Sequence, residues 1–134
     1  MPYESDRYCF ACGEQNPIGL HLQFTYGEGS AEASFIPERS HQGYPGLLHG
    51  GLVATLLDEA MAHAVFAAYG PAVTGELRVR LRGGGAPLGR VLRLRGWIRA
   101  RRGRLVLAEA HLRDEAGTLL AYGEGKFMLA VPVS

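Results

Sequence analysis

Among its 134 residues the sequence has no long uninterrupted apolar run, only two cysteines, one lysine and one asparagine. Asp58, Glu59 and His63 interrupt the longest apolar stretch, so it falls short of the ~18 residues that a membrane span requires. The N-terminus has no basic region followed by an apolar core, so it does not resemble a signal peptide. We therefore expect a cytoplasmic protein with no membrane partner.

Charge of one sign is not in large excess either. The formal net charge of +1 argues against nucleic acid as a dominant partner. The distribution is uneven, because residues 1–70 carry two Arg and eight acids (net −6), whereas residues 71–134 carry eleven Arg, one Lys and five acids (net +7). The arginine rows of the second half form a solvated face by default, and they could also bind phosphates.

The two cysteines, Cys9 and Cys12, form a C-x-x-C pair followed by Gly13. A tetrahedral metal site needs four ligands, and the chain has no second cysteine pair. His21 is the nearest candidate for a third ligand, and a dimer could also bring two cysteine pairs together. We favour a simpler interpretation, two buried small residues in a tight turn, over a metal site or a cytosolic disulfide.

The length corresponds to a single domain, residues 1–134. Residues 1–18 are polar and rich in turn residues, which is typical of an irregular arm, and this N-terminal arm contains the C-x-x-C pair. Apolar and polar residues alternate in residues 20–26 and again in residues 30–36. This alternation predicts the two strands of a hairpin.

Residues 50–69 contain almost no helix breaker and are apolar on more than one face, which predicts a long buried helix. Gly70 and Pro71 end it. In residues 72–131 four segments alternate between apolar and polar residues, which predicts the main strands of an antiparallel sheet with one buried face. The sequence therefore predicts an α+β fold, in which a curled antiparallel sheet of five or six strands wraps one long central helix.

The start of this helix is a candidate reaction site. A loop in residues 37–48 leads into it, and His41 and Gln42 could point from that loop into a site or simply satisfy the loop backbone. Gly50 and Gly51 lack side chains, so a ligand can approach their backbone closely. The first N–H groups of a helix have no intrahelical partners, and the helix dipole adds partial positive charge. These features suit a bound anion or the oxyanion of an acyl-transfer intermediate.

Asp58 and Glu59 are adjacent acids in the apolar helix and point about 100° apart, so only one can face a given site. Glu59 lies four residues before His63 and has a structural partner there, which leaves Asp58 as the candidate general base or nucleophile. Asp58 is roughly 10 Å along the axis from Gly51, too far to act there within one chain. If two chains pair with antiparallel helices, Asp58 of one chain faces the Gly50 end of the other. The alternative is that both acids only cap or pair within the interface.

The sequence His49-Gly50-Gly51, followed by six residues and then Asp58, resembles the hotdog-fold acyl-CoA thioesterases, specifically the PaaI-like group of the 4-hydroxybenzoyl-CoA thioesterase superfamily. Residues 9–13 and 16–20 resemble the N-terminus of a bacterial branch of this group. The resemblance covers nearly the whole chain. It implies a hotdog fold, assembly as homodimers or dimers of dimers (homotetramers), and no metal or cofactor besides the coenzyme A of the substrate.

The resemblance also implies roles for residues at matching positions. The Gly50 N–H would polarise the thioester carbonyl, Asp58 of the partner subunit would activate water or attack directly, and His49 would help shape the acyl site. Thr74 falls where a Ser or Thr of the partner chain often positions water. The basic strands would meet the phosphates of coenzyme A. The candidate substrate-binding residues are Gly51, His41, Gln42, Arg82 and Arg101.

Two positions depart from the pattern of the family. Some relatives carry an Asn six residues before the histidine of the motif, where this chain has Gly43. Gln42 or His41 must then supply that donor, or the donor is missing. The strand after Thr74 usually ends in an Arg-Pro-like turn, whereas here Arg82 is followed by three glycines.

The expected function is that of a homo-oligomeric thioesterase, which hydrolyses an acyl-CoA to the free acid and coenzyme A. An alternative is a non-catalytic acyl-CoA-binding or ligand-sensing hotdog domain, because a fold alone does not set function. Asp58 favours the enzyme, since a pure binder does not need it. A third hypothesis is a metal or redox module built on Cys9 and Cys12.

Overall fold

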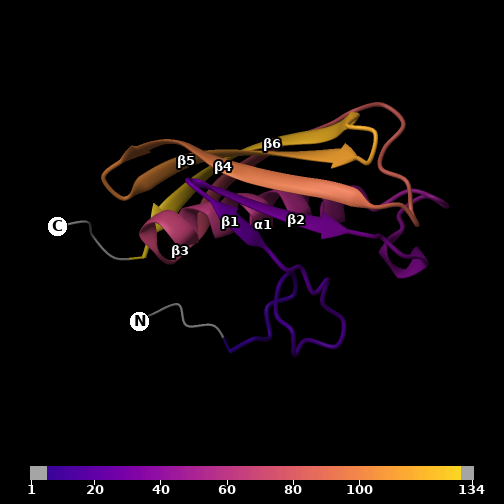
Figure 1. The fold of residues 1–134 in the computed structure, drawn as a ribbon, viewed down its shortest axis with the longest axis horizontal. Helices are drawn as coiled ribbons and strands as arrows, with labels where there is room; N and C mark the ends of the chain where they lie inside the picture. The colour runs from indigo at the N-terminus through magenta and orange to yellow at the C-terminus, as the bar shows by residue number, and fades with distance from the viewer. Residues whose placement is uncertain (1–5, 131–134) are drawn as a thin grey trace.

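The computed structural model describes residues 6–130 (Figure 1). Residues 1–5 of the predicted arm and Val131 at the end of the last predicted strand lie outside this range. In chain order the elements are β1 (Thr25–Gly27), β2 (Ser30–Phe35), the short 3-10 helix η1 (Arg39–His41), α1 (Gly50–Tyr69), β3 (Ala72–Leu81), β4 (Leu92–Arg102), β5 (Leu105–Asp114) and β6 (Leu119–Leu129).

The six strands form one antiparallel sheet in the order β1-β2-β4-β5-β6-β3. The sheet is not closed, so β1 and β3 are its edges. The central helix α1 lies along one face and contacts β2, β3, β4, β5 and β6 (Figure 1). The predicted α+β architecture with one central helix is therefore confirmed.

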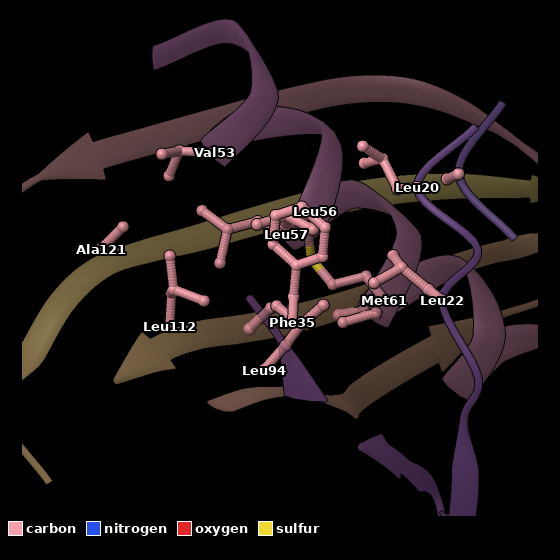
Figure 2. Packing of buried hydrophobic residues seen from close by; sticks show 14 of the residues in the cluster. Leu20, Leu22, Phe35, Val53, Leu56, Leu57, Met61, Leu94, Leu112 and Ala121 are labelled. Atoms are coloured by element: carbon pink, nitrogen blue, oxygen red, sulfur yellow. The ribbon is translucent and has the colours of Figure 1, made fainter. Parts of the chain in front are cut away.

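The core is the layer between α1 and the sheet, where long aliphatic side chains from both sides interlock (Figure 2). Alternation along the strands places one row of side chains in this layer and the next row outside it. Among the largest fully buried side chains are Leu56, Leu57, Met61, Leu92, Leu94, Leu112 and Phe127. The helix approaches β4 so closely that a Cβ on Gly96 would lie 2.5 Å from backbone atoms of Ala60. Only glycine permits this approach, which fixes the height of the helix over the sheet.

Local signals set both ends of α1. His49 caps the first turn, because its Nδ1 accepts a hydrogen bond from the N–H of Gly51 at 2.9 Å. Gly70 ends the helix with a φ of 100°, which favours glycine. The length and hydropathy of α1 would by themselves allow a membrane span. The core helix of a soluble protein passes the same test, and here seven side chains of α1 are buried.

The strand predicted for residues 20–26 is mostly wrong. Only residues 25 and 26 of that range belong to β1, although Leu20 and Leu22 are buried as the alternation predicted. His21 has a φ of 54°, which breaks the extended conformation. The N–H groups of Leu20 and Leu22 bond instead to the carbonyls of Phe10 and Ala11 in the arm, at 2.8 and 3.0 Å. The backbone of residues 20–22 is therefore hydrogen-bonded to the arm and not to a neighbouring strand.

The four later strands match the predicted segments, but the face of β3 that was predicted to be buried is only partly so, with Ala72 and Val79 packed against the core. On β3 the apolar side chains of Val73, Leu77 and Leu81 are 45%, 36% and 50% exposed. The reason is topological: β3 is an edge strand, paired only with β6. Its outer side therefore presents unpaired backbone groups beside exposed apolar side chains, which is typical of an edge covered by another chain.

Candidate active site

Asp58 projects from the middle of α1 toward the edge strand. The hydroxyl of Thr74 on β3 donates a hydrogen bond of 2.7 Å to its Oδ1. Thr74 is exposed, whereas Asp58 is half-buried. The two residues predicted for the chemistry of water activation are thus in direct contact in one chain.

The surroundings of Asp58 favour its protonated form. Burial raises the pKa of this carboxyl above its usual value, the hydrogen bond from Thr74 opposes the increase, and the charge of Glu59 adds to it. A carboxylate with a raised pKa is a stronger base than an ordinary aspartate. The arrangement is chemically suited to accept a proton from water at near-neutral pH.

Glu59 points away from Asp58 and is part of a different network. Nε2 of His63 lies 3.1 Å from Oε1 of Glu59, which confirms the pairing predicted from their spacing of four residues. Nδ1 of His63 contacts the hydroxyl of Tyr26 at 2.8 Å. Burial would raise the pKa of Glu59, but hydrogen bonds from His63 and Cys12 and the charge of His63 outweigh it and hold the pKa below its usual value. The pKa values of the two adjacent acids are therefore shifted in opposite directions, upward for Asp58 and downward for Glu59.

The helix start offers one free donor. The N–H of Gly51 is occupied by the ring of His49, and the N–H groups of Leu52 and Val53 bond to the carbonyl of His49 at 2.9 and 3.0 Å. Within residues 6–130 the N–H of Gly50 has no hydrogen-bond partner. Of the two predicted glycines, Gly50 is thus the one that can donate to an incoming oxygen, and His49 selects it by blocking the other.

The side chains of the preceding loop are used by the loop itself. His41 accepts a hydrogen bond of 2.8 Å from the N–H of Glu38 through Nδ1, and the side-chain Oε1 of Gln42 accepts one of 3.3 Å from the N–H of Gly46. The backbone carbonyl of His41 accepts the N–H of His49 at 2.9 Å. These contacts position the helix start. At Gly43 a Cβ would lie 3.3 Å from the Cα of His49.

The two predicted phosphate ligands lie at opposite ends of the helix. Arg82 directly follows β3, whose last residue, Leu81, lies beside Gly50. Arg101 lies over the ring of Tyr69, the last residue of α1, with its guanidinium carbon 4.6 Å from the ring centroid. A helix of twenty residues is about 30 Å long, so one chain does not bring these arginines together.

The cysteine pair does not lie in the buried turn that the sequence suggested. The turn itself is present, since the N–H of Gly13 bonds to the carbonyl of Cys9 at 2.8 Å, but Cys9 is exposed and Cys12 only half-buried. His21, the nearest candidate for a third ligand in the sequence, instead contacts the carbonyl of Asn16 at 2.6 Å. The thiols face Glu59 on α1, a neighbour fifty positions away that no sequence spacing revealed.

Residues 45–121 match the family model of the thioesterase superfamily, which is more than half of the chain, and the chain belongs to this superfamily. No curated protein matches the sequence.

Solved structures place the fold with the hotdog thioesterases. A thioesterase superfamily protein of known crystal structure is 26% identical with a TM-score of 0.84, and the match covers 91% of this chain and 60% of that longer chain. The E. coli PaaI protein from the phenylacetic acid degradation operon is 19% identical, with a TM-score of 0.75 and coverage of 81% and 83%. A Streptococcus mutans UA159 protein bound to acetyl-CoA is 15% identical, with a TM-score of 0.78 and coverage of 90% and 98%.

The fold is thus the hotdog fold, as predicted from the helix motif. The similarity to PaaI is at the level of the fold. The chain spans less than two thirds of the longest of these relatives.

Proposed function

We propose that this protein is a thioesterase that hydrolyses an acyl-CoA to the free acid and coenzyme A. The observation that carries the proposal is the half-buried Asp58 carboxylate, held by Thr74 at 2.7 Å beside an open strand edge. Membership of the thioesterase superfamily and the likeness to a protein bound to acetyl-CoA support the reaction and the class of ligand.

In the proposed reaction the thioester carbonyl oxygen accepts a hydrogen bond from the N–H of Gly50. The helix start stabilises the negative charge that develops on this oxygen as the tetrahedral intermediate forms. Asp58 removes a proton from the attacking water or attacks the carbonyl carbon itself, and Thr74 orients the carboxylate. The tetrahedral intermediate then collapses and releases the thiolate of coenzyme A. If Asp58 is the nucleophile, the acyl group remains on Asp58 as a mixed anhydride, which a water molecule hydrolyses to the free acid. No other cofactor takes part.

The site is proposed to be shared between two subunits. Asp58 lies eight residues beyond Gly50 on the same helix, about 12 Å along its axis, so the two groups of one chain cannot act on one carbonyl. Both nevertheless border β3: Thr74 contacts Asp58 near one end of the strand, and Leu81 lies beside Gly50 at the other.

Antiparallel pairing of the β3 edges of two chains would bring Asp58 of one chain close to Gly50 of the other. If the two-fold axis passes between Leu77 and Arg78, Thr74 of one chain lies opposite Leu81 of the partner subunit. Asp58 is thereby brought toward Gly50 of the partner subunit, and the exposed apolar side chains of the edge are covered. Either a homodimer or a dimer of dimers can contain this pairing.

The coenzyme A moiety would bind outside this catalytic pair. Antiparallel packing brings the Arg101 end of one chain toward the Arg82 end of the other, so that both arginines could meet phosphates of one ligand. Gly51, His41 and Gln42 would shape the adjoining wall. His41 and Gln42 would contribute indirectly, because their side chains hydrogen-bond to backbone N–H groups and so hold the loop in position.

Thiol release from a panel of acyl-CoAs of different chain length tests the function. Wild type should turn over at least one of them, and Asp58→Asn should be slower by about 10²–10⁴-fold, the usual contribution of a general base. Equal rates for the two proteins would refute the catalytic role. Tight binding of acyl-CoA by wild type without thiol release would instead support the non-catalytic binding domain.

A further inference from the structure

Three potential metal ligands converge from two distant parts of the chain. Cys9 and Cys12 belong to the N-terminal arm, and Glu59 belongs to α1. One donor atom from each lies within 4.8 Å of the others. The Sγ of Cys9 is 4.0 Å from Oε1 of Glu59. Both cysteines are free thiols.

The spacing is close to that of a tetrahedral zinc site. With Zn–S distances of about 2.3 Å and Zn–O distances of about 2.1 Å, tetrahedral angles put sulfur and oxygen about 3.6 Å apart and two sulfurs about 3.8 Å apart. The observed 4.0 Å between Cys9 and Glu59 therefore needs a contraction of only about 0.4 Å.

The Glu59 oxygen that faces Cys9 also has a hydrogen-bond partner, and an oxygen with two lone pairs can accept a hydrogen bond and bind a metal together. Nε2 of His63 contacts this Oε1 at 3.1 Å, its other ring nitrogen contacts the Tyr26 hydroxyl at 2.8 Å, and Phe24 stacks on the ring with centroids 4.1 Å apart. With Nε2–H donating to the carboxylate, the Tyr26 hydroxyl donates to Nδ1. Such outer contacts fix the orientation of a ligand and strengthen metal binding.

The cysteine turn is also positioned independently of any metal. The N–H of Gly13 bonds to the carbonyl of Cys9, and the N–H of Leu20 bonds to the carbonyl of Phe10 between the two cysteines, both at 2.8 Å. A Cβ on Gly13 would lie 2.2 Å from the N of Cys9, so only glycine fits this turn. The two thiols therefore reach Glu59 from a preformed loop, which lowers the entropic cost of assembling a site.

We propose that Cys9, Cys12 and Glu59 bind one zinc ion per chain, with water or another small ligand in the fourth position. Thiolate sulfur and carboxylate oxygen are both ordinary zinc ligands, and paired thiolates favour zinc over magnesium or calcium. The thiols release their protons to solvent as the metal binds, and no oxidation is involved. The ion would hold the arm against α1 at Glu59, the neighbour of Asp58. It would also fix the position of Phe10, which lines a groove of about 780 Å³ together with Leu52.

Metal content and spectroscopy of the full-length protein test this site. Protein reduced, stripped with a chelator and titrated with zinc should take up one equivalent. Cobalt(II) in place of zinc should produce sulfur-to-cobalt charge-transfer absorption and the visible bands of a tetrahedral ion. Because the chain contains only two cysteines, thiolate absorption identifies Cys9 and Cys12 directly. Failure of the reduced wild type to bind either ion would overturn the proposal, as would a Cys9–Cys12 disulfide that re-forms in preference to metal binding.

Variants separate the ligands from their supports. Cys9→Ser, Cys12→Ser and Glu59→Gln should each weaken zinc binding at least 10-fold, whereas Glu14→Gln, the same charge change at an exposed arm residue paired with Arg7, should not. His63→Ala should weaken zinc about 10- to 100-fold while one equivalent still binds at saturation. Unchanged affinity in both cysteine variants would disprove the site. Thiol-release activity is not part of this test, so the outcome is independent of the proposed thioesterase function.

Discussion

Thr74 donates a hydrogen bond of 2.7 Å to Asp58, and this contact ties the edge strand β3 to the middle of the central helix. The bond holds the carboxylate in one orientation and stabilises its ionised form, in opposition to the burial that raises the pKa of Asp58. It also places the carboxylate at the edge where a second chain could add to the sheet. The contact should therefore influence both the pH dependence of activity and the pairing of subunits.

The acid limb of the pH profile should report Asp58. Activity requires the ionised carboxylate, so kcat/KM should rise with pH through a pKa above the usual aspartate value of about 3.9. Thr74→Val removes the hydrogen bond that lowers this pKa, so its acid limb should move to higher pH. Thr74→Ser keeps the hydroxyl and should leave the limb in place. An equal shift in both variants would show that the hydroxyl is not responsible.

Removal of the Gly50 N–H should impair catalysis without unfolding the helix. Gly50→Pro deletes this donor at the first helical position, where proline is tolerated, and His49 already has a ψ of 133° that suits a following proline. Gly50→Ala keeps the N–H, and its Cβ would meet only Leu81 at 3.9 Å. The proline variant should lose about 10²–10³-fold in kcat, and the alanine variant little. Matching circular dichroism and melting of the two variants provide the folding control.

Complementation should reveal a site shared between subunits. Asp58→Asn and Gly50→Pro homodimers should each be nearly inactive. A mixed dimer contains one site with intact Gly50 from one chain and intact Asp58 from the other, beside one site with both defects. Co-expression in equal amounts should therefore restore about a quarter of wild-type activity, because about half of the dimers are mixed. No recovery in purified mixed dimers would mean that each chain contains its own complete site.

The exposed edge of β3 should form the contact between subunits. Leu77 is 36% exposed in the single chain, and in the proposed strand pairing it lies opposite Arg78 of the partner subunit. Leu77→Arg would therefore place like charges opposite each other twice in the pairing, which destabilises it. We expect a folded monomer by size-exclusion chromatography with light scattering, with activity reduced at least about 100-fold because the base from the partner subunit is lost. Ile36→Arg, at an exposed apolar residue next to β2, is the control and should remain oligomeric and active. An active Leu77→Arg monomer would contradict the shared site.

Much of the fold could be predicted because its signals are local. The bounds of α1 match the predicted residues 50–69, since the capping histidine, the two glycines and the Gly70-Pro71 stop all act within one turn of the helix. Strand alternation likewise predicted β2 and the four later strands. The failure in residues 20–26 came from tertiary contacts, because the arm supplies carbonyls that the N–H groups of Leu20 and Leu22 use in place of a neighbouring strand.

The sequence by itself determined the central helix, the strand pattern, the motif of His49, Gly50 and Asp58, and the pairing of Glu59 with His63, because each depends on residues within a few turns of one another. Only the tertiary structure decided three further features. It leaves β3 as an exposed edge, brings Thr74 to Asp58, and sets Cys9 and Cys12 against Glu59. These features depend on strand order and chain crossing over sixteen to fifty positions, and periodicity along a sequence contains no information about such contacts. The sequence alone favoured two small residues in a tight turn at the cysteine pair, and only the folding of the arm onto the helix shows that the carboxylate of Glu59 lies next to both thiols.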